Sequence, residues 1–203
     1  LAIISASYAG QFTEDIGIEK ALKALYHLGF DEIAEQAMIT NITAEIIRDY
    51  IRSHPKIRPV LSSNCPAIVR LIQVRFPSLL TNLLHVESPM SMLAKYYRDK
   101  ITKERNPKPE EIGIFLIVPS ASQVTAVHQP EGTYKHLHDG AIAISDIYCR
   151  VMDILKDLDN DNRKITSYAN GLSWAIAGQE AKEIATDDIR TLAVSGIHNV
   201  IDI

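Results

Sequence analysis

Short apolar runs alternate along this chain with longer stretches in which apolar side chains recur every three or four residues. The short runs predict strands, and the longer periodic stretches predict amphipathic helices. This alternation is typical of βαβ units, so we expect an α/β fold with a mostly parallel sheet. The predicted strands are 2–6, 31–37, 60–63, 114–118 and 141–145, and the predicted helices are 12–28, 43–53, one from 66, one from 89, and 146–158.

Residues with strong local preferences mark the ends of several of these helices. Gly29 follows the first helix, where glycine commonly ends a helix, and Pro55 stops the second. Thr43 and Ser88 can each cap a first turn with a side-chain oxygen. Pro66 stands at the first turn of the third helix, where its missing N–H removes no hydrogen bond.

A polar, proline-bearing stretch divides the chain. Residues 98–111 read RDKITKERNPKPEE, which is the best candidate boundary between two α/β lobes, about 1–105 and about 106–203. Residues 120–139 show little periodicity, so we expect a long loop there. Loops of this length in compact domains are often functional or mobile.

Composition and charge exclude several classes of function. With 203 residues and 46% hydrophobic content, the chain can build one sizeable core or two closely joined lobes. The net charge of −4 and the pI of about 6.0 argue against a nucleic-acid partner.

The cysteines and the start of the chain bear on its compartment. Cys65 and Cys149 form neither a disulfide framework nor a zinc motif, which favours a reducing cytoplasm. We find no apolar run of about 20 residues and no basic leader, so we expect neither a membrane span nor a signal peptide. From Leu1 in place of Met we expect a domain excised from a longer chain or a processed product.

The most informative window reads SSNCPAIVRLIQVRFPSLLTNLLHVESPM and spans residues 62–90. It resembles the first cysteine segment of the iron-only hydrogenase large subunit, in the C-terminal domain that holds the H-cluster. In that family a Thr/Ser-x-Cys-Cys-Pro turn precedes a helix, a Tyr/Phe-Pro-x-Leu step and a Ser-Pro pair. The matching residues here are Cys65, Pro66, Phe76, Pro77, Leu79, Ser88 and Pro89.

Three later windows are similar to further segments of the same family. GIFLIVPSASQ, from Gly113, resembles a buried strand that ends in Met/Gly-Pro-Cys and then a lysine. Ser120 takes the place of that cysteine, and Gln123 takes the place of the lysine. LSWAIAGQEAKE from Leu172 and TLAVSGIHNVIDI from Thr191 are similar to two more segments. Family members continue into a Cys-x-x-x-Cys segment with two more ligands, and this chain stops before it.

The resemblance implies two intertwined α/β lobes, each a mostly parallel sheet flanked by helices, with a cleft between them. Of the four cysteines that bind the cluster in the family, only Cys65 is present. Cys65 is therefore the candidate metal ligand, and the candidate cofactor-binding residues are Cys65, Ser63, Pro119 and Ser120. Asn64 takes the place of the cysteine that relays protons in catalytic members, and asparagine has no ionisable proton to pass on.

The local pattern by itself favours plainer interpretations of two of these residues. Cys65 precedes a helix N-terminus, which favours a thiolate, but a free cysteine is more commonly a buried, inert side chain. Only the resemblance reverses that preference. Ser120 is a poor ligand for a soft iron–sulfur site, and capping a turn is the better interpretation of it.

Other candidate chemistry has less support. His128, His136 and His138 fit no catalytic zinc pattern, and we interpret them as surface loop residues. Met90 is the methionine that could approach a cluster pocket, and Ala126 stands near the place of a glutamate that continues the proton path in active family members. Motifs for nucleotide hydrolysis, serine esterases and zincins are absent from the sequence.

Three functions are compatible with these observations. The first is an iron-only hydrogenase-like domain, related to proton reduction and hydrogen oxidation but catalytically incompetent as it stands. Its family implies an iron–sulfur cluster in the full-length protein, none bound in this fragment, and ferredoxin-type iron–sulfur domains as partners in the same chain or as electron donor. The second is a redox-sensing, hydrogen-sensing or scaffold module. The third is an unrelated α/β domain that binds a small ligand at the strand ends near Ser63 and Val118.

Overall fold

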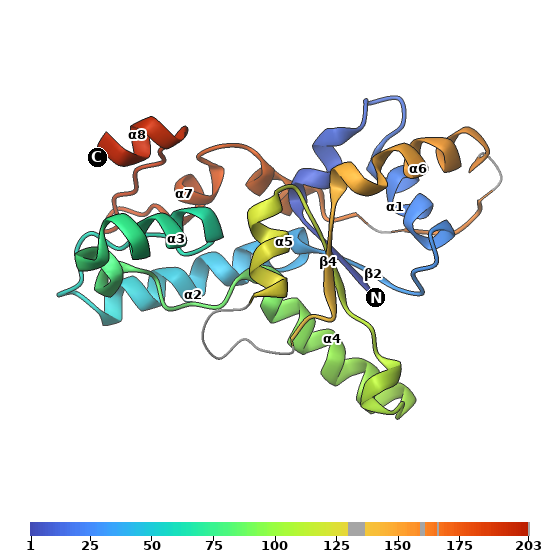
Figure 1. The fold of residues 1–203 in the computed structure, drawn as a ribbon, viewed down its shortest axis with the longest axis horizontal. Coiled ribbons are helices and arrows are strands. Elements are labelled where there is room, and N and C mark those ends of the chain that lie inside the picture. Colours follow the sequence, from blue (N-terminus) through green and yellow to red (C-terminus); the bar gives the residue numbers. More distant parts are fainter. Residues whose placement is uncertain (130–136, 159–160, 166, 203) are drawn as a thin grey trace.

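A computed structural model describes residues 1–129, 137–158, 161–165 and 167–202 of the chain. Its parallel strands form one four-stranded sheet in the order β2-β1-β3-β4 (Figure 1). In the register, Ala2 lies beside both Ile33 and Phe115, and Phe115 lies beside Gly140. The strands are β1 (Ala2–Ile4), β2 (Ile33–Glu35), β3 (Phe115–Val118) and β4 (Gly140–Ala143).

The two halves of the chain share this sheet. The first half supplies β1 and β2, the second supplies β3 and β4, and β1 pairs directly with β3. Both central strands are apolar and buried, with Ile3, Ile117 and Val118 at 0% exposure, and strands covered on both faces belong in the middle of a parallel sheet. In the described residues both halves of the chain therefore contribute to one sheet, and not to a separate sheet in each lobe. The lobe boundary near residue 105 stays a prediction.

Two helices, α1 (Ile18–His27) and α6 (Ile144–Lys156), cover one face of the sheet (Figure 1). Their apolar side chains pack with Ile4 and Ile117 of the central strands. Tyr8 is buried in the same cluster, where its hydroxyl donates a hydrogen bond to Ala21 O at 3.1 Å. Burial raises the pKa of the Tyr8 hydroxyl well above its usual range, so this donor stays protonated.

Helices α4 (Pro89–Arg105) and α5 (Ala121–His128) lie against the other face. Successive side chains of a strand point to opposite faces, so Leu116 and Val118 join this second core while Ile117 joins the first. Leu93 of α4 and Val124 of α5 pack against them. The expected α/β class, with a mostly parallel sheet flanked by helices, is confirmed.

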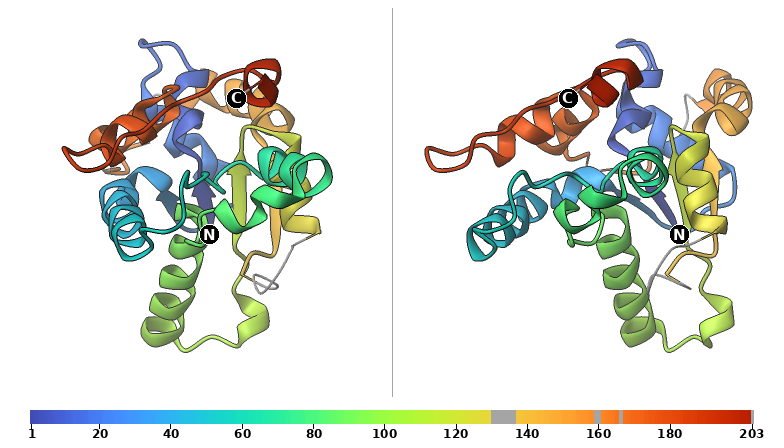
Figure 2. Two further views of the ribbon diagram at one scale, coloured as in Figure 1. Left: turned by 90° about the vertical axis from the view of Figure 1, so that its left-hand side faces the viewer. Right: turned by 60° about the vertical axis from the view of Figure 1, so that its left-hand side comes forward.

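A third, smaller cluster joins α2 (Thr40–Ser53) to α7 (Gln179–Ile184), with Ile47 and Ile184 among its members. The C-terminal segment with α8 (Ile197–Asp202) lies at the end of the molecule opposite α4 (Figure 2). The remaining helix is α3 (Pro66–Arg75), and shorter 3-10 segments are Ala6–Gln11, Gln36–Ile39, Pro77–Asn82, Pro109–Glu111 and Ala169–Ala175.

Several helix ends obey the local signals. Pro66 is the first residue of α3, and α2 ends at Ser53, two residues before Pro55. Ser88 caps α4, because its Oγ accepts a hydrogen bond from the Ser91 N–H at 3.1 Å. Gly29 follows α1 with a φ of 103°, a conformation in which other residues are strained.

Two helix starts differ from the prediction by three residues or more. The first helix begins at Ile18 rather than at residue 12, because Gly17 has a φ of 70° and interrupts the helical backbone. The second begins at Thr40, which places Thr43 inside it. The Thr43 hydroxyl donates to Ile39 O at 2.9 Å and therefore does not cap the helix.

Two connecting segments also differ. Residues 60–63 do not form the predicted strand, because only Leu61 pairs with another segment, in an isolated parallel bridge with Leu83. The Leu61 N–H donates to Asn82 O, and the Leu61 C=O accepts from the Leu84 N–H. Residues 120–139 contain α5, which Ser120 caps and whose Val124 and Val127 reach the second core. The part of this predicted loop at 130–136 lies outside the described residues.

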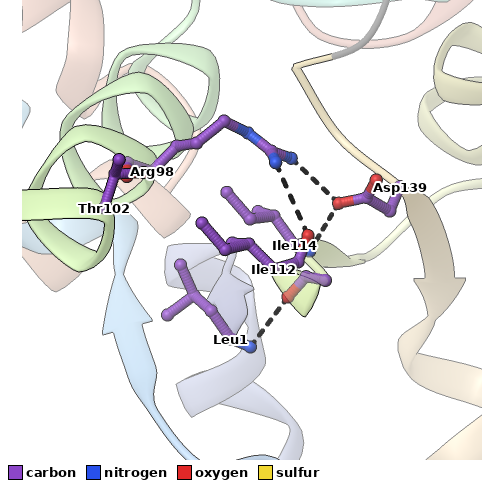
Figure 3. A network of polar contacts seen from close by, with 7 residues as sticks. Leu1, Arg98, Thr102, Ile112, Ile114 and Asp139 are labelled. Atoms are coloured by element: carbon purple, nitrogen blue, oxygen red, sulfur yellow. Dashed lines mark hydrogen bonds and ion pairs between the residues drawn. The ribbon is translucent and has the colours of Figure 1, made fainter. Parts of the chain in front are cut away.

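Polar contacts join the amino ends of the strands to α4 (Figure 3). Asp139 Oδ2 accepts hydrogen bonds from Arg98 Nη2 at 2.9 Å and from the Ile114 N–H at 2.7 Å. The Leu1 amino group donates to Gly113 O at 2.9 Å. In the described part of the chain, no helix has both the length and the apolar character needed to cross a membrane.

Candidate functional site

A cavity of about 800 Å³ opens at the carboxyl ends of β1 and β3, a size in the range of small-molecule sites. Ser5 and Pro119, which directly follow these strands, line it. Open parallel sheets commonly bind ligands at this edge because the loops that follow the strands converge there. The cavity continues along the sheet face, over Leu116 and Val118, to His138 just before β4.

The first turns of three helices line the same cavity. Pro66 and Ala67 belong to α3, Met90 to α4, and Ser122 and Gln123 to α5. These turns carry N–H groups that have no carbonyl partner inside their own helix. The cavity wall therefore offers backbone donors from several directions.

A partly buried carboxyl group lies in the cavity wall. Glu180, in the first turn of α7, accepts a hydrogen bond from Asn64 Nδ2 at 3.2 Å. Burial raises the pKa of Glu180, while hydrogen bonds from Asn64 and Ser62 work in the opposite direction. The net shift is upward, so desolvation outweighs these two hydrogen bonds.

His138 lines the other end of the cavity. Its Nε2 atom is buried and has no hydrogen-bond partner among the described residues. Burial lowers the pKa of His138, and the nearby Arg98 charge lowers it further, so the neutral imidazole is favoured. A neutral ring nitrogen in this position can accept from or donate to a molecule in the cavity.

The predicted cofactor-binding residues and Asn64, at the proton-relay position, divide into two groups. Ser63, Asn64 and Pro119 line the cavity. Cys65 and Ser120 are not among its lining residues, and Cys65 is exposed to solvent. The alternative of a buried cysteine is therefore wrong, and the ligand role of Cys65 stays a prediction.

The Ser120 hydroxyl has local partners that account for it. Its Oγ accepts from the Gln123 N–H at 3.4 Å, lies 3.0 Å from Ser122 Oγ and lies 3.2 Å from Gln123 Oε1. Ser63 Oγ is likewise engaged, because it donates to Leu84 O at 2.8 Å. Ser120 thus caps α5, in agreement with the interpretation of this serine as a turn cap.

Residues outside the predicted set complete the picture. Met90, Gln123 and Ala126 line the cavity, and His128 is exposed at the end of α5. His136 lies outside the described residues. Within the described ranges, no three His, Cys, Asp or Glu side chains gather closely enough to hold a metal ion.

Sequence reasoning missed Glu180. The window LSWAIAGQEAKE contains Glu180, which lies 116 positions after Asn64 in the sequence. A lone glutamate at a helix start does not indicate that its side chain contacts so distant a residue. Trp174, which packs against the third cluster, also lines the cavity, and its Nε1 donates to Glu183 Oε2 at 2.5 Å.

Comparisons with solved structures agree with this architecture. An apo FeFe-hydrogenase HydA1 from Chlamydomonas reinhardtii is similar with a TM-score of 0.64 and 14% identity, over 84% of this chain and 46% of that one. A HydA structure described as revealing stepwise H-cluster assembly is similar with a TM-score of 0.62 and 15% identity, over 84% of this chain and 45% of that one. The chain thus spans less than half the length of these proteins, and at such identities the likeness shows the fold alone.

The comparison with protein-family models identifies the family of this chain. No curated protein matches the chain significantly. The family described as "Iron only hydrogenase large subunit, C-terminal domain" matches residues 1–147, which is most of the 203 residues. The chain therefore belongs to the family of the iron-only hydrogenase large subunit, C-terminal domain.

Proposed function

We propose that this chain is a catalytically silent iron-only hydrogenase-like domain that serves as a scaffold or sensing module. The observation that carries the proposal is the composition of the cavity wall, which includes no cysteine among its described lining residues. Iron–sulfur clusters are held by cysteine thiolates, so the residues present do not fit an H-cluster.

The substituted positions support the same proposal. Ser120 offers a hard hydroxyl oxygen in place of a soft thiolate, and that oxygen already caps α5. Asn64 has no ionisable proton and instead donates to Glu180. A proton relay and a cluster ligand are thus both replaced by hydrogen bonds within the domain.

The setting of the domain is part of the proposal. We propose that it works inside a longer, cytoplasmic protein, beside ferredoxin-type iron–sulfur domains. The basis is the family together with the coverage of less than half of the solved relatives.

The test is anaerobic iron and acid-labile sulfide analysis, with a hydrogen-uptake assay, on the longest natural chain that contains these residues, after cluster reconstitution. Because such a chain can carry other clusters, wild type is compared with Cys65→Ala. We expect equal iron in both proteins and no hydrogen turnover in either.

A matched pair sharpens the result. Ser120→Cys adds a thiol at the family's ligand position, and Ser145→Cys adds one at an exposed first-turn position of α6. A loss of about four iron atoms per chain in Cys65→Ala, or hydrogen uptake by wild type, would overturn the proposal.

A further inference from the structure

We infer that the cavity binds an uncharged, mostly apolar small molecule that packs against its apolar wall and makes few hydrogen bonds. The inference rests on the proposed function, because it requires that no cluster occupies the cavity. It gives the sensing module a class of ligand.

Apolar side chains line the cavity from separate parts of the fold. Ile47 belongs to α2, Met90 to α4, Leu116 to β3 and Val127 to α5, and Trp174 comes from the 3-10 segment Ala169–Ala175. Such a wall offers water few hydrogen bonds. Replacing that water with an apolar molecule is therefore favourable.

Hydroxyl groups on this wall already have partners within the protein. Ser63 Oγ donates to Leu84 O at 2.8 Å, and Ser88 Oγ donates to Ser91 Oγ at 2.9 Å. A charged ligand would lose its hydration without gaining these hydroxyl protons in return, and that loss opposes its binding.

The helix starts beside the cavity give little support to a charged ligand. Ser88 Oγ accepts the Ser91 N–H at the start of α4, and Ser120 Oγ accepts the Gln123 N–H at the start of α5. At the start of α3, Pro66 has no N–H to donate. An anion would therefore compete with caps that are already formed.

The acidic and basic side chains among the described lining residues are paired, favour their neutral form or are exposed. Glu87 pairs with Lys95. Burial raises the pKa of Glu180, which favours its uncharged form. Arg70 is exposed to solvent and donates to Gln73 Oε1 at 3.1 Å. This wall is thus better matched to an uncharged ligand than to an ion.

The experiment compares two dyes that share an aromatic amine and differ in charge. N-phenylnaphthylamine is uncharged, and anilinonaphthalene sulfonate adds a sulfonate to the same ring system. Trp174 is the one tryptophan in the sequence and lines the cavity, so energy transfer from it reports on a dye bound there. We expect one saturable site that binds the neutral dye at least about tenfold more tightly than the sulfonate dye.

Variants that fill the cavity test its role. Ala126→Phe, on α5, occupies part of the cavity and is expected to weaken the neutral dye at least about fivefold. Ala67→Phe makes the same change at an exposed lining position of α3, where the core is not disturbed, and should act in the same direction.

Ala121→Phe is the matched control. Ala121 is exposed on the same helix as Ala126 and is not among the lining residues, so this substitution should leave both dye titrations unchanged. Circular dichroism of each variant verifies that it is folded.

A sulfonate dye that binds as tightly as the neutral dye, equal titrations for wild type, Ala126→Phe and Ala67→Phe, or the lack of saturable energy transfer would overturn the inference. The iron analysis of Cys65→Ala is a separate readout. A loss of iron in that variant removes the proposed function, whereas unchanged iron without a preference for the neutral dye removes only the inference about the ligand.

Discussion

Arg98 of α4 and Asp139, immediately before β4, meet at 2.9 Å through Arg98 Nη2 and Asp139 Oδ2. The same oxygen accepts the Ile114 N–H at 2.7 Å, so one carboxylate joins a helix, the start of β3 and the start of β4 (Figure 3). Hydrogen bonds to a charged group are stronger than those between neutral groups.

Replacing this carboxylate should destabilise the fold. Asp139→Ala leaves the Ile114 N–H and the Arg98 guanidinium without their acceptor, and we expect a loss of about 1–2 kcal/mol in the free energy of unfolding. Asp153→Ala is the control, because it breaks only the exposed ion pair with Lys156 and should change stability by less than about 0.5 kcal/mol. Urea unfolding measures both. Equal effects of the two substitutions would show that the Asp139 contacts add nothing beyond a surface pair.

Glu180 should make stability depend on pH. Because the pKa of its carboxyl is higher in the folded protein than in the unfolded chain, the folded state holds the proton more tightly. The resulting stabilisation is present below the unfolded pKa and is lost as the pH rises through the folded pKa. Glu180→Gln keeps an acceptor for Asn64 but cannot ionise, so it should lose less stability than wild type between about pH 4 and about pH 8. Urea unfolding across that range checks this.

The control for this pH effect is Glu104→Gln, at an exposed position of α4. Its pH profile should follow that of wild type. Parallel profiles for wild type and Glu180→Gln would count against a raised pKa of the Glu180 carboxyl in the cavity wall.

Gly171 should tolerate no side chain. A Cβ there would lie 2.0 Å from Ala37 O, which is backbone and cannot rotate away, so Gly171→Ala should cost several kcal/mol or prevent folding. Gly10→Ala is the control, since nothing lies within 4 Å of its added Cβ. Thermal unfolding followed by circular dichroism distinguishes them. Similar midpoints for the two variants would mean that the segment around Gly171 packs less closely against Ala37.

Both cysteines should react with a thiol reagent in the folded protein. Cys65 and Cys149 are exposed, so titration of the native chain with Ellman's reagent should modify two thiols without denaturant. Cys65→Ser should leave one reactive thiol and unchanged stability, because an exposed side chain contributes little packing. A Cys65 thiol that reacts only after denaturation would point to a protected environment and reopen its role as a ligand.

Local sequence signals were sufficient wherever a short segment decides its own conformation. Pro66 and Ser88 start α3 and α4 as expected, since a proline at a first turn and a serine cap act over three or four residues. The apolar runs that contain Ile3 and Ile117 predict buried central strands, because only a covered sheet tolerates such runs. The α/β class follows from that alternation.

Tertiary packing decided the rest. α5 has only eight residues and no clear amphipathic pattern, and its helix depends on contacts of Val124 and Val127 with the second core, which no local pattern reveals. The pairing of β1 with β3 joins segments more than 100 residues apart, and the partners of a buried strand depend on how all the strands assemble.

The candidate site is also decided by tertiary packing. The resemblance identified Asn64 and Pro119 as candidate site residues. Only the folded chain brings Glu180 to Asn64, leaves Cys65 out of the cavity wall and places three helix starts around one cavity. Helix and turn preferences are short-range, whereas a cavity forms where distant segments fail to fill the space between them. Its shape is therefore a property of the packed molecule.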